Sequence, residues 1–237
     1  PLFTAGRLTA GDSGTLSRVS KSEVYSVIES DLLSAVSGLQ AKKSSDGRAT
    51  SFTAHALLGK VYLYQDKFSD AANILEPLVG LYTLPSDPSS VFLVEGENGP
   101  ESVFEIQHSK ESNGWNWGWM PQGTEGNFGV IHHGIRGYSG PVYASGWSFN
   151  VPTQDLVDAF DSGDKRKNAS VLDIAAWADA NNAQYSEGYE HTGYFNNKYI
   201  PRSGYSKNTA ELNYENNYRY IRYAAVSYTH LRAHETR

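Results

Sequence analysis

The sequence has no cysteine, a single methionine, and fewer basic than acidic residues. The absence of cysteine excludes disulfide bonds and thiol chemistry. With 20 Lys and Arg against 26 Asp and Glu, the net charge is −6. This charge argues against nucleic acid as a partner, because no basic surface would offset the phosphates. No apolar run approaches the roughly 18 residues that a membrane-spanning helix needs.

The chain also lacks an initiating methionine and a secretory signal, since it begins at Pro1-Leu2-Phe3. We therefore expect a fragment of a longer protein. Aromatic residues and glycine, by contrast, are abundant, with 16 Tyr, 9 Phe, 5 Trp and 22 Gly. This composition favours an extracellular or periplasmic binding protein over a cytosolic enzyme.

Residues 47–84 carry two helical patterns joined by a short polar break at 65–67. Small and large residues fall where a tetratricopeptide hairpin of about 34 residues places them. Gly59 leaves a gap on the first helix, Ala71 lets the second helix approach, and Leu75 closes the wedge. Pro77 should kink or shorten the second helix. Such a hairpin cannot bury its apolar side alone, so neighbouring helices are predicted; the alternative is an ordinary hairpin of a globular domain.

A helix is predicted before this hairpin and a loop-rich portion after it. Ser20-Lys21-Ser22-Glu23 is a capping-box pattern, and apolar residues then recur at helical spacing as far as Leu39. Further on, 102–107 alternates like a strand, 152–160 restarts a helix, 171–180 fits a short helix and 218–223 fits a strand. The helix that this last strand would enter is not expected to form. Residues 111–150 are rich in glycine and tryptophan without any period, which is typical of a functional loop region.

These pieces, in this order, resemble the SusD/RagB family, the surface glycan-binding lipoproteins of glycan-foraging Gram-negative bacteria. Each piece alone is a weak match, and their shared order along the chain carries the resemblance. The matching segments are 18–20, 23–25, 31–32, 47–50, 56–64, 101–107, 152–160, 163–166, 217–218 and 221–224.

The resemblance implies a mainly α fold, in which tetratricopeptide-like helical hairpins carry a loop-rich, short-strand-containing ligand-binding portion. We expect one domain over residues 1–226, truncated at both ends, with the helices in 19–84 and the loop-rich portion in 85–226. Residues 227–237 depart from the family pattern and are similar to the read-through ends of translated sequence assemblies. We expect a non-native tail there and exclude it from functional argument.

The resemblance also implies a function. Proteins of this family bind oligosaccharides or polysaccharides at the cell surface and deliver them to a SusC-like TonB-dependent transporter, and they are not enzymes. A lipid on an N-terminal cysteine anchors them to the outer membrane, and that cysteine is absent from this sequence. The expected partners are therefore a glycan and the transporter, the expected location is the outer-membrane surface, and no cofactor is expected.

The most suggestive local feature is a run of three tryptophans between residues 115 and 119. Sugars offer apolar C–H faces to aromatic rings and hydroxyls to side chains such as asparagine. The tryptophans alternate with smaller residues, so an extended backbone would place all three indoles on one side. The competing interpretation is that such rings are buried as packing residues, the role expected of Trp147. The predicted carbohydrate-binding residues are Trp115, Asn116, Trp117, Trp119, Tyr138, Tyr143 and Trp177.

Two other functions are compatible with the sequence. Tetratricopeptide stacks ordinarily bind peptides, and Tyr62 and His55 would then lie on the contacting helix faces. Asp155, Asp158 and Asp161 share a helical spacing that allows a two-carboxylate glycoside hydrolase. A solvated helix face, with the last of them near Arg166, is the favoured interpretation of these carboxylates.

Metal and nucleotide chemistry find little support in the motifs. His132 and His133 are adjacent and face different ways in most backbones, so they make a poor metal pair. No nucleophile elbow, phosphate loop, dinucleotide fingerprint or calcium loop is present. No metal site is predicted.

Overall fold

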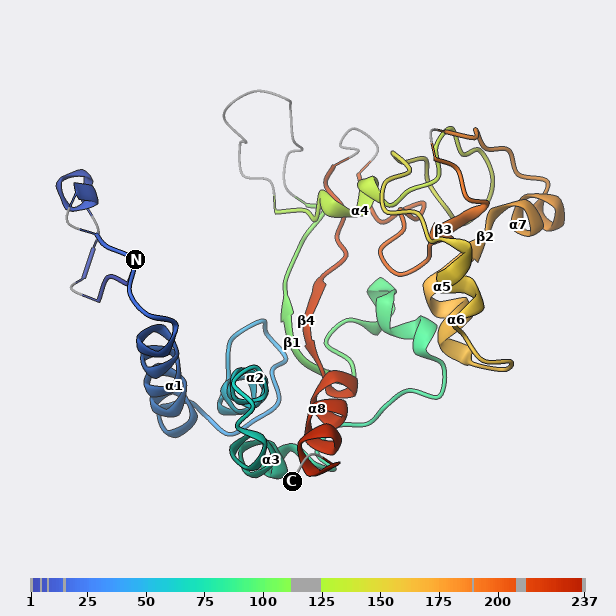
Figure 1. The fold of residues 1–237 in the computed structure, drawn as a ribbon. Helices are drawn as coiled ribbons and strands as arrows, with labels where there is room; N and C mark the ends of the chain where they lie inside the picture. The colour runs from blue at the N-terminus through green and yellow to red at the C-terminus, as the bar shows by residue number, and fades with distance from the viewer. Residues whose placement is uncertain are drawn as a thin grey trace. The chain divides into compact units, whose positions relative to one another are not determined.

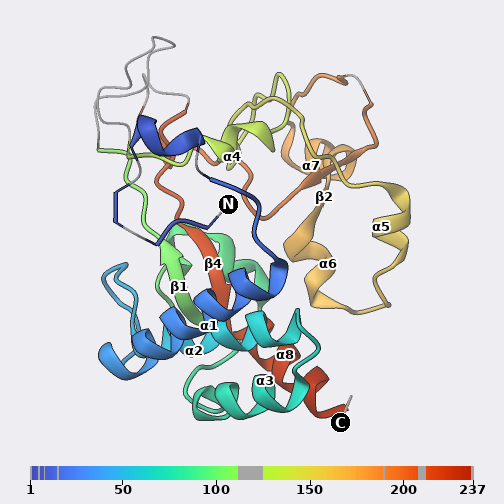
Figure 2. The ribbon, with the colours of Figure 1, turned by 60° about the vertical axis from the view of Figure 1, so that its left-hand side comes forward.

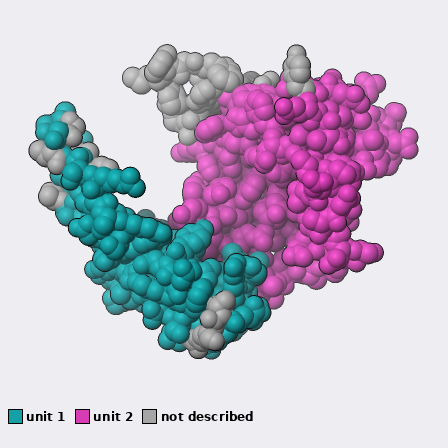
Figure 3. Space-filling model, in the orientation of Figure 1, with its two compact units in different colours: residues 1–82, 223–237 teal, residues 83–222 magenta. Residues whose placement is uncertain are grey.

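The computed structural model describes residues 2–4, 6–7, 9–14, 16–111, 125–188, 190–207 and 212–235. The chain divides into two compact units, unit 1 with residues 1–82 and 223–237 and unit 2 with residues 83–222 (Figure 3). None of the described helices is long and apolar enough to cross a membrane. Along the chain (Figure 1) the elements are η1 (Ala10–Gly14), α1 (Lys21–Gly38), α2 (Ser51–Leu63), α3 (Phe68–Leu75), η2 (Glu76–Leu78), η3 (Pro88–Phe92), η4 (Val94–Gly96), β1 (Ser102–Ile106), α4 (Gly129–His132), α5 (Gln154–Asp158), α6 (Lys165–Ser170), β2 (Val171–Asp173), α7 (Ile174–Asn181), β3 (Tyr194–Asn196), β4 (Tyr218–Arg222) and α8 (Tyr223–Glu235).

The first long helix of unit 1 starts where the capping box predicts. The Ser20 hydroxyl accepts a hydrogen bond from the Glu23 N–H, and the Glu23 carboxylate accepts one from the Ser20 N–H at 3.0 Å. These bonds satisfy donors at the helix start that have no partner within the helix. α1 packs along α2, yet none of its residues is buried (Figure 2).

The tetratricopeptide-like hairpin is confirmed as α2 and α3, and with it the mainly α fold class. The turn between the helices holds Asp66 in a left-handed conformation, with φ 58°. Gly59 faces Leu75, and a Cβ atom on Gly59 would lie 2.5 Å from Leu75 Cδ2. The glycine therefore permits the close approach that its position in the pattern predicted. α3 ends at Leu75, one residue before the 3₁₀ turn that contains Pro77, as expected.

The helix α8 corrects the expectation that no helix would follow the last strand. It packs against α3 and α2, with Val226 and Ala233 buried. Ala233 lies against Ala71 and Ala72, so small residues meet on both sides of this contact. This contact buries part of the apolar face of the helix. That residues 227–237 are a non-native tail stays an expectation from the sequence, which this conformation does not test.

Unit 2 contains two short antiparallel sheets. β1 pairs with β4, with Ile106 opposite Tyr218, which confirms both predicted strands. β2 pairs with β3. Residues 171–173 form β2 and so correct the helix predicted over 171–180. That helix, α7, begins only at Ile174, after Asp173 has accepted a hydrogen bond from the Ala176 N–H at 3.0 Å.

A buried arginine connects β4 to the loops before β1. The side chain of Arg219 is 1% exposed and donates to the carbonyl oxygens of Asn217 at 2.7 Å and Leu93 at 2.5 Å. Its guanidinium pairs with Glu97 at 3.3 Å and lies 3.8 Å from a carboxylate oxygen of Glu105. Because the two carboxylates flank one cation, each charge in this group needs the others to remain buried.

Candidate carbohydrate-binding surface

Four of the predicted site residues lie outside the described part of the chain. These are Trp115, Asn116, Trp117 and Trp119, all within residues 112–124. Contact of these residues with a sugar therefore stays a prediction. The segments that flank them, up to residue 111 and from residue 125, belong to unit 2.

Tyr138, Tyr143 and Trp177 come together in unit 2, and they pack against one another. The rings of Tyr138 and Tyr143 lie 5.9 Å apart and those of Tyr143 and Trp177 lie 4.9 Å apart, both edge to face. Trp177 Nε1 donates to Tyr138 Oη at 2.9 Å, and Tyr138 Oη donates to the Pro141 carbonyl at 2.7 Å. Burial raises the pKa of Tyr143.

This arrangement gives the three rings different access to a ligand. Tyr138 is 8% exposed and Tyr143 is 5% exposed, as members of a core cluster with Ile135 and Phe195. Trp177, on α7, is half-buried against the same cluster. The two tyrosines therefore form part of the packing that supports the loops, and their contact with a sugar also stays a prediction.

A second group of aromatic residues faces solvent, and the sequence patterns did not single it out. We call Phe128, His132, Trp147 and Phe149 the aromatic patch. Phe128 is 63% exposed and Phe149 is 55% exposed. The His132 ring is at the centre, 4.8 Å from Trp147, 5.9 Å from Phe149 and 6.0 Å from Phe128 between centroids. Trp147 also packs against the core cluster around Val130, which joins the patch to the core of unit 2.

The backbone builds this patch by pairing the end of α4 with residues 146–149. Trp147 N–H donates to the Ile131 carbonyl at 3.0 Å, and Phe149 N–H donates to the His132 carbonyl at 2.7 Å. Directly before these residues, a Cβ atom on Gly146 would lie 2.3 Å from the Gly134 Cα, so only glycine fits there. The close backbone crossing therefore brings rings from two separate segments onto one surface.

Phe149 lies between two residues with left-handed backbone conformations. Ser148 has φ 60° and Asn150 has φ 56°. The Ser148 hydroxyl accepts a hydrogen bond from the Arg136 N–H at 3.1 Å, and the Arg136 guanidinium donates to the Trp147 carbonyl at 2.8 Å. The exposed aromatic rings thus lie beside the His132 imidazole, and the Arg136 guanidinium lies against the backbone of Trp147. Such a surface can stack on the C–H face of a sugar and hydrogen-bond its hydroxyls.

The sequence contained one signal for this patch that was not used. Trp147 and Phe149 alternate at a spacing of two, as the tryptophans of 115–119 do. Phe128 could not have been joined to them, because it lies on the other segment and becomes a neighbour only through the backbone pairing. His132, considered for metal binding, belongs to the patch instead. Burial lowers the pKa of the adjacent His133.

The three carboxylates considered for a hydrolase are all exposed to solvent. Asp155 and Asp158 are exposed on α5, and Asp158 accepts a hydrogen bond from Gln154 at 2.8 Å. Arg166 forms its ion pair with Asp164 at 2.6 Å, while Asp161, expected near this arginine, contributes a weaker charge interaction. Asp164 caps α6 and lies only two residues before Arg166. Both of its carboxylate oxygens accept hydrogen bonds from the Arg166 guanidinium.

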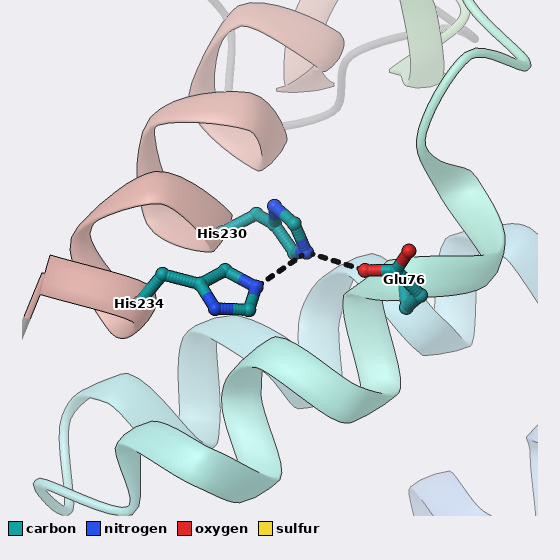
Figure 4. A group of neighbouring side chains, drawn as sticks. All are labelled: Glu76, His230 and His234. Atoms are coloured by element: carbon teal, nitrogen blue, oxygen red, sulfur yellow. Dashed lines mark hydrogen bonds and ion pairs between the residues drawn. The ribbon is translucent and has the colours of Figure 1, made fainter. Parts of the chain in front are cut away.

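Glu76, His230 and His234 bring three ligand atoms within 4.8 Å of one another in unit 1 (Figure 4). Such a group is the kind of cluster that can hold a metal ion. Both histidines, however, lie in residues 227–237, the segment set aside above because its sequence departs from the family pattern. We therefore assign no metal site here.

The two units together define a class of protein: tetratricopeptide-like helices combined with a loop-rich unit that carries exposed aromatic rings. No family model matches the sequence, and no curated protein matches it. Solved structures do match. A laminarin-binding SusD-like protein is 36% identical over 91% of this chain, with a TM-score of 0.82.

Two further structures agree with this match. Surface glycan-binding protein A from Bacteroides fluxus is 29% identical over 91% of the chain, with a TM-score of 0.80. Surface glycan-binding protein A from Bacteroides thetaiotaomicron, in complex with laminarihexaose, shares the fold, with 24% identity over 90% of the chain and a TM-score of 0.76. The resemblance that the sequence predicted is confirmed, and the chain belongs to the SusD-like proteins. It spans about half the length of these structures, namely 50%, 47% and 50%.

Proposed function

We propose that this protein binds a glycan at the cell surface and is not an enzyme. The observation that carries the proposal is the match to a laminarin-binding SusD-like protein, at 36% identity over 91% of the chain. One of the similar structures, surface glycan-binding protein A from Bacteroides thetaiotaomicron, is a complex with laminarihexaose. The exposed rings of the aromatic patch supply a surface of the kind that such a ligand needs.

We place glycan contact on the aromatic patch together with Trp115, Asn116, Trp117 and Trp119. Phe128 lies four residues after the segment 112–124, so the two sets of rings are neighbours along the chain. Of the other predicted residues, Tyr138 and Tyr143 are buried and Trp177 is half-buried, so Trp177 is the most accessible of the three. A neutral β-glucan such as laminarin is the appropriate first probe, because relatives are named for it.

Affinity gel electrophoresis with laminarin tests this placement. Aromatic contacts contribute about 0.5–1.5 kcal/mol each, so Phe128→Ala and Phe149→Ala should each weaken retention roughly two- to tenfold. Trp115→Ala, Trp117→Ala and Trp119→Ala test the predicted run in the same gel. Tyr64→Ala is the matched control, because this ring in unit 1 is 63% exposed, as Phe128 is.

The possible results of this gel distinguish a wrong site from a wrong function. Retention of the wild-type chain with no loss in any of the five variants would move the site elsewhere and leave glycan binding intact. No retention on any neutral or acidic glycan would remove the proposed function. Capture of peptides through Tyr62 and His55 would favour the tetratricopeptide alternative.

We further propose that the full-length protein is lipid-anchored at the outer-membrane surface and passes its glycan to a TonB-dependent transporter. The family resemblance of the ordered motifs supports this role. Membrane fractionation of the full-length protein and its co-purification with a transporter barrel test it. Recovery in the periplasm, or without a barrel under conditions that preserve such complexes, would contradict the proposal.

A further inference from the structure

Unit 2 has a cavity of about 350 Å³ that the glycan proposal does not use. Its apolar wall includes Phe92, Leu156 and Phe160, and its polar groups include Asp161, Lys198 and Arg222. The volume is that of a small ligand pocket, where a few polar groups on an apolar wall fix the orientation of the ligand. None of the residues of the aromatic patch lines this cavity.

Lys198 is the unusual group in this pocket. Its ammonium lies 5.2 Å from the centroid of the Phe92 ring, and the residue is half-buried. Among the described residues, no carboxylate forms an ion pair with it. Burial lowers its pKa, and the nearby Arg222 lowers it further. A partly desolvated ammonium with no anion to offset its charge is unfavourable, so a bound anion would stabilise it.

The other charges of the pocket are already compensated or face water. Arg222 lies 5.0 Å from the same Phe92 ring, and its Nε is 3.1 Å from the buried Glu101 carboxylate. Arg166 is held by Asp164, as described above. Asp161 is exposed. Lys198 is therefore the partly buried charge of this pocket that no described carboxylate offsets through an ion pair.

We propose that this pocket binds the oxyanion of an acidic sugar, either a carboxylate or a sulfate ester. The oxyanion would accept hydrogen bonds from Lys198, while the sugar ring lies against the apolar wall. The inference rests on the proposed function, because it assumes that the anion is carried by a glycan. It adds acidic sugars to the neutral glycans for which the relatives are named.

Three monosaccharide probes distinguish the sources of the oxyanion: glucuronic acid, glucose 6-sulfate and glucose. Binding to the 237-residue chain is measured by calorimetry. At least one acidic probe should bind on the order of tenfold more tightly than glucose, because a hydrogen bond to a charged group contributes about 1.5–3 kcal/mol. Glucuronic acid alone would identify a carboxylate site, and glucose 6-sulfate alone would identify a sulfate site.

A variant pair assigns the effect to the pocket. Lys198→Met keeps the aliphatic stem and removes the charge, so the preference for the acidic probe should fall on the order of tenfold. Lys60→Met is the matched control, because Lys60 also lies over a ring, 5.7 Å from the centroid of Tyr64, and lines none of this cavity. Lys198→Arg should retain the preference for acidic probes.

A second readout needs no variant that could misfold. In protein that carries ¹³C-labelled lysine, the NMR signal of Lys198 Cε should titrate at lower pH than the signals of the exposed lysines. Addition of the acidic probe should move the midpoint of the Lys198 titration to higher pH. Equal binding of all three probes, or an unchanged preference in Lys198→Met, would overturn the proposal. Laminarin retention in the gel is independent of this pocket, so its loss would count against the proposed function alone.

Discussion

Replacing Gly59 by alanine tests how closely the two helices of the hairpin approach. A Cβ atom at this position would lie 2.5 Å from both Cδ2 and Cγ of Leu75. Leu75 is 0% exposed and cannot swing into solvent to make room. Overpacking of this kind costs roughly 1–3 kcal/mol, whereas alanine gains up to about 1 kcal/mol over glycine in a helix. We expect Gly59→Ala to lower the free energy of unfolding by about 1 kcal/mol.

Gly38→Ala is the matched control. Gly38 is the last residue of α1, and a Cβ atom there would meet nothing within 4 Å. Only the change in helix propensity remains, so this variant should raise the free energy of unfolding by up to about 1 kcal/mol. The two substitutions are chemically identical and should have opposite signs.

A double-mutant cycle assigns the cost to the contact with Leu75. Leu75→Ala alone should destabilise by about 2–5 kcal/mol, because it opens a cavity in a fully buried site. In the double variant the new methyl group at position 59 enters that cavity. The two effects should then be non-additive by about 1 kcal/mol, in the direction of rescue.

Urea denaturation followed by far-UV circular dichroism is the appropriate assay. The three longest helices, α1, α2 and α8, belong to unit 1, whereas all five tryptophans lie in unit 2 and report on it by fluorescence. With a slope of about 1–3 kcal/mol per molar urea, a loss of about 1 kcal/mol moves the midpoint down by roughly 0.3–1 M. If Gly59→Ala were as stabilising as Gly38→Ala, the close approach of the helices would be refuted.

Three further predictions concern buried polar groups. Arg219→Met leaves the buried Glu105 carboxylate and the partly buried Glu97 carboxylate without their cation. It should destabilise unit 2 by about 3–5 kcal/mol in urea, read by tryptophan fluorescence; a loss below 1 kcal/mol would contradict this. Burial raises the pKa of Glu101 above its usual 4.5, so its contribution to stability is complete below that pH and is lost as the pH rises through the raised pKa. Glu101→Gln should therefore make the decline in stability from pH 4.5 to 7 shallower, and an unchanged slope would count against it. The buried Tyr82 hydroxyl has no hydrogen-bond partner among the described residues, and burial raises its pKa to about 12. Tyr82→Phe should therefore leave the free energy of unfolding, followed by circular dichroism, unchanged or raise it by about 1 kcal/mol.

Much of unit 1 could be predicted because its signals are local. The capping box at Ser20 and Glu23 joins residues three apart, and the Gly59 gap follows from helical spacing alone. Pro77 stops a helix through its own ring. In each case the responsible residues lie within a turn or two of the element that they determine.

The parts that the sequence did not predict depend on contacts between distant segments. Val171–Asp173 is a strand because β3 lies beside it, more than twenty residues later in the chain. Likewise, α8 packs against α3, although the hydrophobic pattern of its own sequence is weak. The aromatic patch requires α4 and residues 146–149 to cross at two glycines, and no periodicity in either segment encodes that crossing.

The same crossing bears on how a ligand would bind. Left-handed residues such as Ser148 and Asn150 cost of order 1 kcal/mol each, and they persist because the surrounding backbone bonds over-determine them. A large ring held exposed at Phe149 also forgoes the free energy of burial. Both free-energy costs arise when the protein folds, so a sugar that stacks on the patch does not have to order these residues. Loss of one backbone bond in this crossing should therefore weaken binding even when every ring is still present.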